Sequence, residues 1–344
     1  MAQINLRDFL LEALQRRVSD VYMIPGCPMT ITIAGQTSQV GDKLTPADTE
    51  QLIRELYRLA CRDGMDRLFQ TGDDNFSFSL PSVSRFRVST LRQRNSYGCI
   101  IRMIPFDLPN PEQYNIPQEV MNICDIDSGL VLVAGMSRSG KSTTISCLLE
   151  QLNNTRSGQL ILTLENPIES VYRHKKCIVV QREIYTDTQS YAEGLDAAWY
   201  QHANILMVSN LPDNDTARGV LRMAQSGSLV STTMPGTSAV PALQNLMDMF
   251  LEDRQATIRK QLASTLRAVV FQQMVPSADG KILPVFEILS IEEPMRQLIA
   301  DGNLEQISAN IAASKTRGVV AFDRSLVGLF NRQRITFDVA LKYA

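Results

Sequence analysis

One ten-residue stretch constrains the fold of this chain more than any other. Residues 135–144 read GMSRSGKSTT, in which Gly135, Gly140, Lys141 and Ser142 satisfy the pattern G-x-x-x-x-G-K-[ST]. The run LVLVA precedes this stretch as a candidate strand, and STTISCLLEQL follows it as a candidate helix. A glycine-rich loop between a strand and a helix turns backbone N–H groups toward a phosphate. The sequence therefore predicts a phosphate-binding loop, or P-loop, in an α/β fold.

The residue types in the loop predict how it would hold a nucleotide. Lys141 would reach the β- and γ-phosphates, and the hydroxyl of Ser142 would ligate Mg²⁺. The alternative is a chance glycine-rich turn, which the flanking strand and helix disfavour. The predicted nucleotide-binding residues are Gly135, Met136, Ser137, Arg138, Ser139, Gly140, Lys141, Ser142 and Thr143.

Composition limits what else the chain can be. Its 344 residues exceed the usual size of a single core and predict two domains. Lys and Arg total 34 against 36 for Asp and Glu, so bulk charge gives no reason to expect a nucleic-acid partner. The longest nearly apolar run, residues 129–136, is too short to cross a bilayer, and Arg7 and Asp8 lie where a signal peptide would be apolar. We therefore expect a globular cytoplasmic protein.

A proline-rich segment marks the expected domain boundary. Residues 106–120, FDLPNPEQYNIPQEV, hold three prolines and few apolar side chains, which is typical of an extended connector. We expect a first domain at residues 1–106, a linker at 107–119 and a second domain at 120–344.

The hydrophobic patterns differ on the two sides of this linker. Upstream, TPADTEQLIRELYRLAC has helical spacing, and NFSFSLPSVSRFRVSTLRQRNSYGCIIRMIP resembles strands separated by turns, so the first domain should be α+β with an antiparallel sheet. Downstream, GLVLVAG, QLILTLE, NILMVSN and SLVSTTM are short continuous apolar runs, which indicate parallel strands covered on both faces by helices. The second domain should be an α/β nucleotide-binding fold with a mostly parallel sheet.

The segments after the P-loop resemble one family. Residues 161–184, ILTLENPIESVYRHKKCIVVQREI, and residues 187–195, DTQSYAEGL, resemble the acidic box of the secretion ATPases that power type IV pili and type II secretion. RFRVSTLRQRNSYGCIIRMIP is similar to the family's first domain, and LRAVVFQQMV and PVFEIL to its later core. Among these ATPases the match is nearest to the PilT-like pilus retraction motors.

This resemblance implies a motor that uses ATP and Mg. It implies a homo-hexameric ring whose subunits pair a PAS-like first domain with a RecA-like second domain and bind ATP between them. It also implies a cytoplasmic protein, peripheral to the inner membrane, that acts on an inner-membrane pilus base protein. Membrane contact would then be only through partners, and a paralogous pilus ATPase would be a further partner.

The resemblance also implies roles for four residues outside the loop. Glu165 matches the glutamate that activates the attacking water, and Glu169 matches the second acidic residue of the box. Arg87 and Arg102 match first-domain arginines that approach the phosphates. The alternatives are a solvated carboxylate at a strand end for Glu165 and plain surface charges on strands for the two arginines.

Several positions depart from the family pattern. The second acidic motif aligns with SNLPD, which places Asn210 where a glutamate is usual and Pro212 where an arginine is usual. The histidine box aligns with GSLVSTTMPGTSA, so that Ser228 and Pro235 replace two histidines. An amide carries no charge and cannot accept a proton. Treating these losses as grouped around one site, we expect ATP binding with weak hydrolysis.

Three functions remain open from the sequence. The first is an active retraction motor, favoured by the P-loop, by Glu165 and by PMRQLI at residues 294–299, which lies where retraction motors carry A-I-R-N-L-I. The second is a hydrolysis-deficient, nucleotide-gated subunit that modulates a paralogous motor, favoured by Asn210, Ser228 and Pro235. The third is a DNA-transfer or type II secretion ATPase on the same fold.

Overall fold

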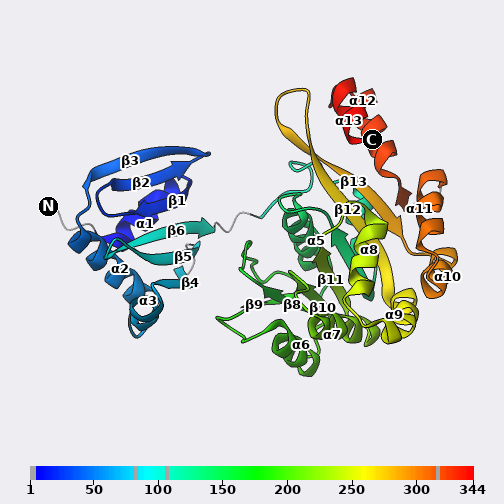
Figure 1. The fold of residues 1–344 in the computed structure, drawn as a ribbon, viewed down its shortest axis with the longest axis horizontal. Helices are drawn as coiled ribbons and strands as arrows, with labels where there is room; N and C mark the ends of the chain where they lie inside the picture. Colours follow the sequence, from blue (N-terminus) through cyan, green and yellow to red (C-terminus); the bar gives the residue numbers. More distant parts are fainter. Residues whose placement is uncertain (1–4, 81–83, 105–107, 315–317) are drawn as a thin grey trace. The chain divides into compact units, whose positions relative to one another are not determined.

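The computed structural model describes residues 5–80, 84–104, 108–314 and 318–344. The chain divides into two compact units (Figure 1). Unit 1 comprises Met1–Asp107 with Glu169–Val171, and unit 2 comprises Leu108–Ile168 with Tyr172–Ala344. The expected boundary between residues 106 and 107 lies outside the described residues, and the linker limits at 107–119 stay a prediction.

Unit 1 is built on a six-stranded antiparallel sheet with the strand order β3-β2-β1-β6-β5-β4. Its longest helix begins at a capping box, in which Thr45 and Asp48 exchange hydrogen bonds between side chain and backbone. Its elements are α1 (Leu6–Gln15), β1 (Val18–Met23), β2 (Pro28–Ile33), β3 (Gln36–Lys43), α2 (Pro46–Leu59), α3 (Asp66–Thr71), β4 (Asp73–Leu80), β5 (Ser84–Gln93) and β6 (Ser96–Ile104).

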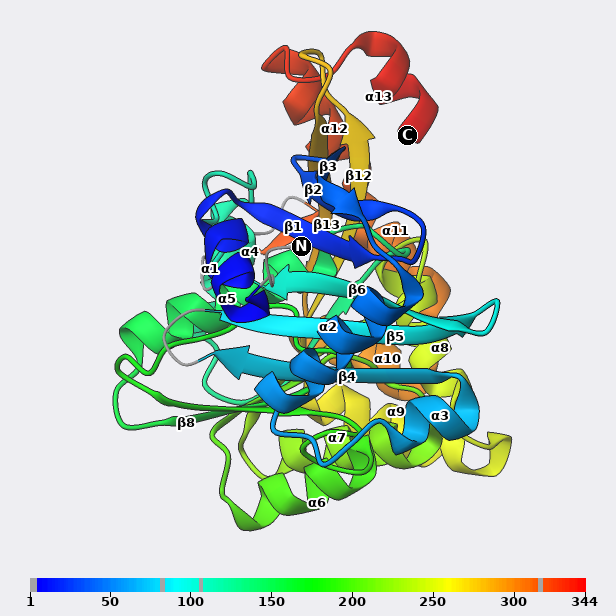
Figure 2. The same cartoon turned by 90° about the vertical axis from the view of Figure 1, so that its left-hand side faces the viewer.

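The helices of unit 1 cover one face of this sheet (Figure 2). Along β5 burial alternates, with Phe86 and Val88 buried and Arg87 exposed between them. The buried set packs with apolar residues of α1, α2 and α3 in one core. Because side chains alternate along a strand, the opposite set, which includes Arg87, lies on the face away from this core.

Unit 2 is built on an eight-stranded sheet with the order β14-β13-β12-β7-β11-β10-β8-β9. Strands β7 to β12 pair in parallel, and β13 and β14 are antiparallel additions. Its elements are α4 (Gln118–Met121), η1 (Asn122–Asp125), β7 (Gly129–Ala134), α5 (Lys141–Thr155), β8 (Leu160–Glu165), β9 (Ile178–Glu183), α6 (Tyr191–Tyr200), β10 (Ile205–Val208), α7 (Asn214–Gln225), β11 (Leu229–Met234), α8 (Ala239–Asp248), α9 (Glu252–Thr265), β12 (Leu266–Pro276), β13 (Ile282–Ser290), α10 (Glu293–Asp301), α11 (Leu304–Ala313), β14 (Val319–Val320), α12 (Phe322–Asn331) and α13 (Phe337–Tyr343).

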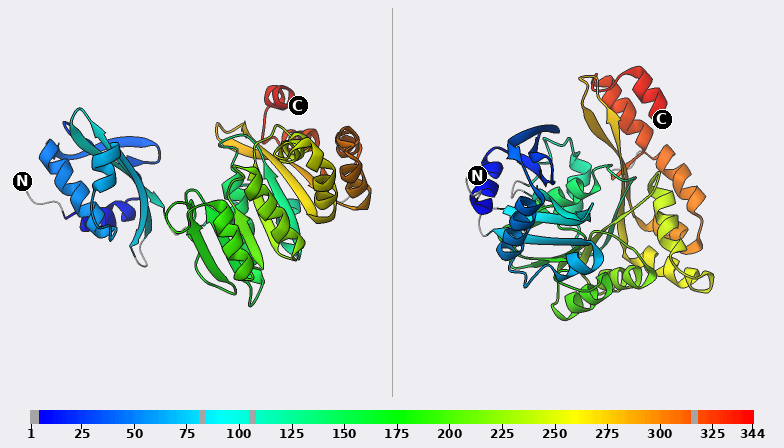
Figure 3. Two further views of the ribbon diagram at one scale, coloured as in Figure 1. Left: turned by 60° about the horizontal axis from the view of Figure 1, so that its bottom comes forward. Right: turned by 60° about the vertical axis from the view of Figure 1, so that its left-hand side comes forward.

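Helices cover both faces of the unit 2 sheet (Figure 3). Helices α6 to α11 contribute to the core on one face, while α4 and α5 contribute to the core on the other. Every residue of β7 is buried, as a central parallel strand requires. The predicted fold class, α/β with an antiparallel first sheet and a mostly parallel second sheet, is confirmed.

The last two helices have a small core of their own. Leu326 of α12 and Ile335 pack against Val275, Leu283 and Val285 near the turn between β12 and β13. Across the described ranges, no helix combines the length and apolarity needed to cross a bilayer.

Candidate nucleotide-binding site

The P-loop connects β7 to α5 in a conformation that only glycine fits at two points. Gly135 has φ +148° and Gly140 has φ +88°. A Cβ at Gly135 would lie 2.3 Å from the Gln272 carbonyl oxygen, and one at Gly140 would lie 2.7 Å from Gln272 Nε2. Gly140 is also the N-cap of α5 and has no side chain to cap it, so the first N–H groups of the helix remain available to an anion.

Polar groups of the loop are arranged around its interior. Lys141 Nζ donates to the Gly135 and Met136 carbonyl oxygens, both at 2.8 Å. Ser139 is 5% exposed, and within the described part of the chain its Oγ finds no hydrogen-bond partner. Ser142, in the first turn of α5, is exposed. A buried hydroxyl without a partner is costly, and a phosphate oxygen would satisfy it.

Gln272 of β12 contacts the P-loop and the first turn of α5. Its side chain is 3% exposed, and its Oε1 accepts a hydrogen bond from Thr144 Oγ1 at 2.6 Å. The same residue approaches both Gly135 and Gly140. Gln272 therefore positions the P-loop and the first turn of α5 at once.

The order of the parallel strands sets the order of residues along one edge of the sheet. The P-loop leaves the carboxyl end of β7, Pro235 follows β11, Asn210 follows β10, and Glu165 ends β8. Neighbouring strands lie about 4.8 Å apart, so the end of β8 is about 14 Å from the end of β7. Pro235 and Asn210 therefore lie at the strand ends between the P-loop and Glu165.

Glu165 is held in a single buried orientation. Its side chain is 3% exposed, and its Oε1 accepts hydrogen bonds from Thr163 Oγ1 at 2.6 Å and from Gln181 Nε2 at 3.1 Å. Gln181 in turn accepts from the Tyr172 backbone N–H at 2.9 Å. Burial, with a smaller contribution from the negative charge of Glu165, raises the pKa of Tyr172 above its ordinary value. The glutamate is a fixed, buried carboxylate at a strand end.

The loop after Glu165 is fixed at two backbone positions. The Ile168 N–H donates to Glu183 Oε2 at 3.1 Å, and the Asn166 N–H donates to Ser209 Oγ at 3.2 Å. Glu183 is itself buried, whereas Glu169, further along the loop, is exposed. The structure thus separates the two predicted catalytic carboxylates into one buried group and one solvent-exposed group.

Asn210 is exposed and follows a well-anchored residue. Ser209 Oγ is 2.8 Å from the Tyr191 hydroxyl, and its carbonyl oxygen accepts from Thr233 Oγ1 at 2.7 Å. Burial raises the pKa of Tyr191 above its ordinary value. Hydrogen bonds therefore anchor this strand end at Ser209, and the side chain that follows it is an uncharged amide.

The two predicted arginines are neighbours on the outer face of the unit 1 sheet. Arg87 of β5 and Arg102 of β6 lie directly opposite each other in the antiparallel pairing, and both are exposed. Asp20 Oδ1 accepts from Arg102 Nε at 2.8 Å, and Ser19 Oγ donates to Asp20 Oδ2 at 2.8 Å. Within the described ranges no carboxylate pairs with Arg87. Like charges placed opposite each other repel, so this pair is suited to receive an anion.

The residues present fit a magnesium-bound nucleoside triphosphate. The uncapped N-terminus of α5, the unpartnered Ser139 hydroxyl and Lys141 suit phosphate oxygens. The exposed Ser142 hydroxyl, a hard oxygen at the start of α5, suits Mg²⁺, which prefers oxygen ligands. In the described ranges, histidines, cysteines and carboxylates form no group of three that could hold a metal ion.

Comparison with known proteins identifies the family. Residues 3–284 match the family described as Type II/IV secretion system protein. The chain belongs to this family. It is 30% identical to the type IV pilus retractation ATPase PilT of Pseudomonas aeruginosa over 344 residues, which cover 99% of this chain and 98% of PilT.

Other relatives place this secretion-system family member among the PilT-like proteins. It is 30% identical to the type IV pilus ATPase PilU of Pseudomonas aeruginosa, with 95% of this chain and 85% of PilU covered. The solved structure of the pilus retraction motor PilT with bound ADP superposes with a TM-score of 0.88 at 30% identity, covering 99% of this chain and 96% of that one. The predicted PilT-like resemblance is confirmed.

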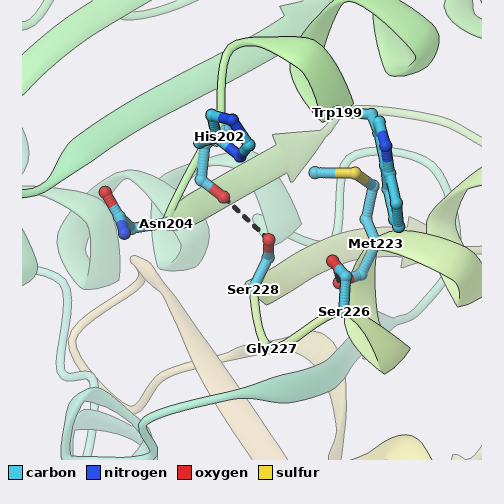
Figure 4. Close-up of a pocket in the computed structure, with 8 residues that line it drawn as sticks. Trp199, His202, Asn204, Met223, Ser226, Gly227 and Ser228 are labelled. Atoms are coloured by element: carbon cyan, nitrogen blue, oxygen red, sulfur yellow. Dashed lines mark hydrogen bonds between the residues drawn. The ribbon is translucent and has the colours of Figure 1, made fainter.

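Ser228, one of the departures from the family pattern, does not lie at the edge of the sheet that holds the P-loop. Ser228 precedes β11, whose first residue pairs with Gly129 at the start of β7, and Ser228 Oγ donates to the Ala203 carbonyl oxygen at 2.7 Å. Six residues of strand, about 20 Å, separate this amino edge from the P-loop edge. The expectation that Ser228 belongs with Asn210 and Pro235 around one site is wrong. Ser228 instead lines a cavity of about 440 Å³ with Trp199, His202, Ala203, Asn204, Met223, Ser226 and Gly227 (Figure 4).

Three residues that support the site were not singled out from the sequence. Gln272, Gln181 and Glu183 hold the P-loop, Glu165 and the following loop, respectively. Gln181 and Glu183 lie within the acidic box at residues 161–184, 16 and 15 positions after the residues that they contact, whereas Gln272 lies 128 positions after Thr144. The motif covers the first two residues, but the contacts of all three side chains follow only from the strand pairing.

Proposed function

We propose that this family member is a motor subunit that binds ATP with Mg²⁺, hydrolyses it slowly and drives retraction of a type IV pilus. The carrying observation is the combination of a complete P-loop with a buried, doubly hydrogen-bonded Glu165 on a fold that matches the PilT retraction motor over nearly its full length. The proposal includes a homo-hexameric ring on the cytoplasmic side of the inner membrane. An inner-membrane pilus base protein is the proposed partner.

The roles proposed for individual residues follow from their placement. The P-loop residues 135–143 bind the phosphates, Lys141 offsets their charge, and Ser142 ligates Mg²⁺, which would draw charge from the phosphate oxygens. Glu165 orients the attacking water with a carboxylate that its partners hold in place. Glu169, being exposed, would act only after it is covered by another part of the assembly.

Arg87 and Arg102 are proposed to stabilise the charge that develops on the γ-phosphate. The two guanidinium groups lie side by side on one face of the sheet, and among the described residues only that of Arg102 is paired with a carboxylate. This arrangement supports the proposed role. Arg85 on the same strand supplies a matched control, because its Nη1 is already close to Ser79 Oγ. We expect Arg87→Ala to lower turnover far more than Arg85→Ala.

The decisive experiment is steady-state phosphate release from the assembled protein with Mg·ATP, with Lys141→Ala as the blank. Turnover above the blank that falls in Glu165→Gln supports the motor. Nucleotide binding without turnover, in protein whose assembly has been verified, would contradict hydrolysis by this chain.

A second candidate function is favoured by Asn210. An exposed amide lies at the strand end between the P-loop and Glu165, where a carboxylate would support the water and the metal. The chain would then bind nucleotide, assemble and modulate a paralogous pilus ATPase. The test compares the Glu165→Gln variant with the unmodified protein for stimulation of such an ATPase. Equal stimulation by the two proteins distinguishes this function from the motor.

A further inference from the structure

A cavity of about 390 Å³ opens in unit 2, away from the residues assigned so far. It lies between the segment before α4, strand β13 and helix α12, and no P-loop residue lines it. Its volume falls within the range of cavities that bind small molecules. Its lining includes Asn115, Phe286, Arg324, Gly328, Arg332 and Arg334.

Three arginines line this cavity against one acidic residue, Glu119. The Arg334 guanidinium donates to Asn115 Oδ1 at 3.0 Å, and Arg324 donates to the Ser314 carbonyl oxygen. Each contact uses one of the five N–H donors of a guanidinium and restrains its position. The remaining donors are arranged as forks that match the oxygens of a carboxylate or a phosphate.

Other residues that line the cavity form an apolar wall. Phe286 and Ile288 are buried in the core beneath β13, and Leu329 of α12 and Pro284 complete the wall. A mostly apolar lining with a few charged groups is typical of small-molecule binding sites.

Gly328 lines the cavity at a point where space is free. It lies inside α12, where glycine is less stable than alanine, yet no left-handed φ requires glycine there. A Cβ built on Gly328 would meet no atom within 4 Å, so no close contact requires it either. The absence of a side chain at this position leaves space directly beside the arginines.

We propose that this cavity binds a small ligand with an anionic group, a phosphate or a carboxylate, on an apolar body. The arginines receive the anionic group and the wall formed by Phe286 and Leu329 receives the body. This site is separate from the nucleotide site and does not depend on the proposed motor function.

The test uses 8-anilinonaphthalene-1-sulfonate, a fluorescent probe that carries an anionic group on a flat apolar body. Titrations are made on the full chain with saturating Mg·ADP, so that the P-loop does not contribute. We expect Gly328→Phe, which fills the cavity, and Arg332→Glu, which reverses a charge, each to weaken probe binding at least tenfold. Gly328→Ala and Arg254→Glu, the latter an exposed arginine outside the cavity, should bind as the unmodified protein does.

Competition then distinguishes the two anionic groups. Displacement of the probe by guanosine 5′-monophosphate assigns a phosphate ligand, and displacement by phenylpyruvate assigns a carboxylate ligand. If Gly328→Phe disturbs folding, as circular dichroism would reveal, Arg332→Glu decides alone. Unchanged probe affinity in a folded Arg332→Glu variant, or displacement by neither compound, would overturn the proposal.

Discussion

At the scale of single residues, the position of a side chain along its strand decides whether it can take part in the chemistry. Ser228 and Pro235 belong to one sequence box, yet they lie at opposite ends of β11. Asn210 and Pro235 are distant in sequence, yet they end neighbouring parallel strands. A motif that spans a whole strand therefore joins two regions with different roles.

This separation yields a paired prediction. Asn210→Glu restores a carboxylate between the P-loop and Glu165, and we expect it to raise steady-state phosphate release by about tenfold or more. Ser228→His, at the far edge of the sheet, should leave the rate unchanged. Equal effects of the two substitutions, or no effect of Asn210→Glu in folded protein, would show that the amide does not limit turnover.

The sequence could predict the residues of the P-loop but not those that position them. Gly135, Gly140 and Lys141 carry a local pattern whose physical reason can be stated from spacing alone. Gln272 lies 131 positions after Lys141 by the printed numbering and reaches the loop only because β12 pairs with β7. A single sequence contains no signal for that adjacency.

Substitution of Gln272 tests whether this side chain positions the P-loop. Gln272→Leu removes the acceptor of Thr144 Oγ1 and leaves a buried hydroxyl unpaired, a loss of about 1–3 kcal/mol. We expect weaker Mg·ADP binding, by about tenfold, in isothermal titration calorimetry. Gln273→Leu is the matched control, because adjacent residues on a strand face opposite sides of the sheet. Equal losses in both variants would indicate a general effect on β12.

At the scale of elements, the strands were better predicted than the helices that follow them. The four apolar runs named from sequence became β7, β8, β10 and β11, because parallel strands buried on both faces must be apolar throughout. For the segment after residue 294, no pattern in the sequence indicates that α10 and α11 join the main core while α12 packs on the β12–β13 hairpin.

The N-terminus of α8 depends on a buried carboxylate. Glu287 of β13 accepts from the Ala239 N–H at 2.7 Å, and burial raises its pKa above the ordinary value. Because the folded state favours the protonated form of Glu287, protonation of this carboxyl contributes to the free energy of unfolding. The contribution is complete below the pKa of Glu287 in the unfolded state, and it is lost as the pH rises through the pKa of Glu287 in the folded state.

We therefore expect Glu287→Gln to become more stable relative to the unmodified protein as the pH rises from about 4.5 toward neutrality. The glutamine oxygen can still accept from Ala239 without carrying a buried charge. Urea unfolding of both proteins across this range measures the difference. A stability difference that stays constant with pH would contradict the assignment.

At the scale of the whole molecule, the chain holds separate cores. The core of unit 1 is formed by residues 6–103, whereas the two main cores of unit 2 cover the two faces of its own sheet. The P-loop and Glu165 both belong to unit 2. Nucleotide that binds through the P-loop should therefore stabilise one unit more than the other.

Scanning calorimetry tests this division. We expect two transitions, of which Mg·ADP at 100 times its dissociation constant stabilises only one, by about 2.7 kcal/mol. Lys141→Ala should abolish that shift and leave the other transition in place. A single transition that moves as a whole would mean that the two units unfold cooperatively.

The hydrogen bonds from Lys141 to the carbonyls of its own loop have a consequence for ligand selectivity. An anion that draws the amine away from these carbonyls must compensate for two charge-assisted hydrogen bonds, each worth about 1.5–3 kcal/mol. A lone sulfate or phosphate offers few oxygens in return, whereas a chain of phosphoryl groups reaches the lysine, the helix N-terminus and Ser139 together. We therefore expect the loop to discriminate by the number of linked phosphoryl groups, and simple anions of the same charge to compete poorly with Mg·ADP.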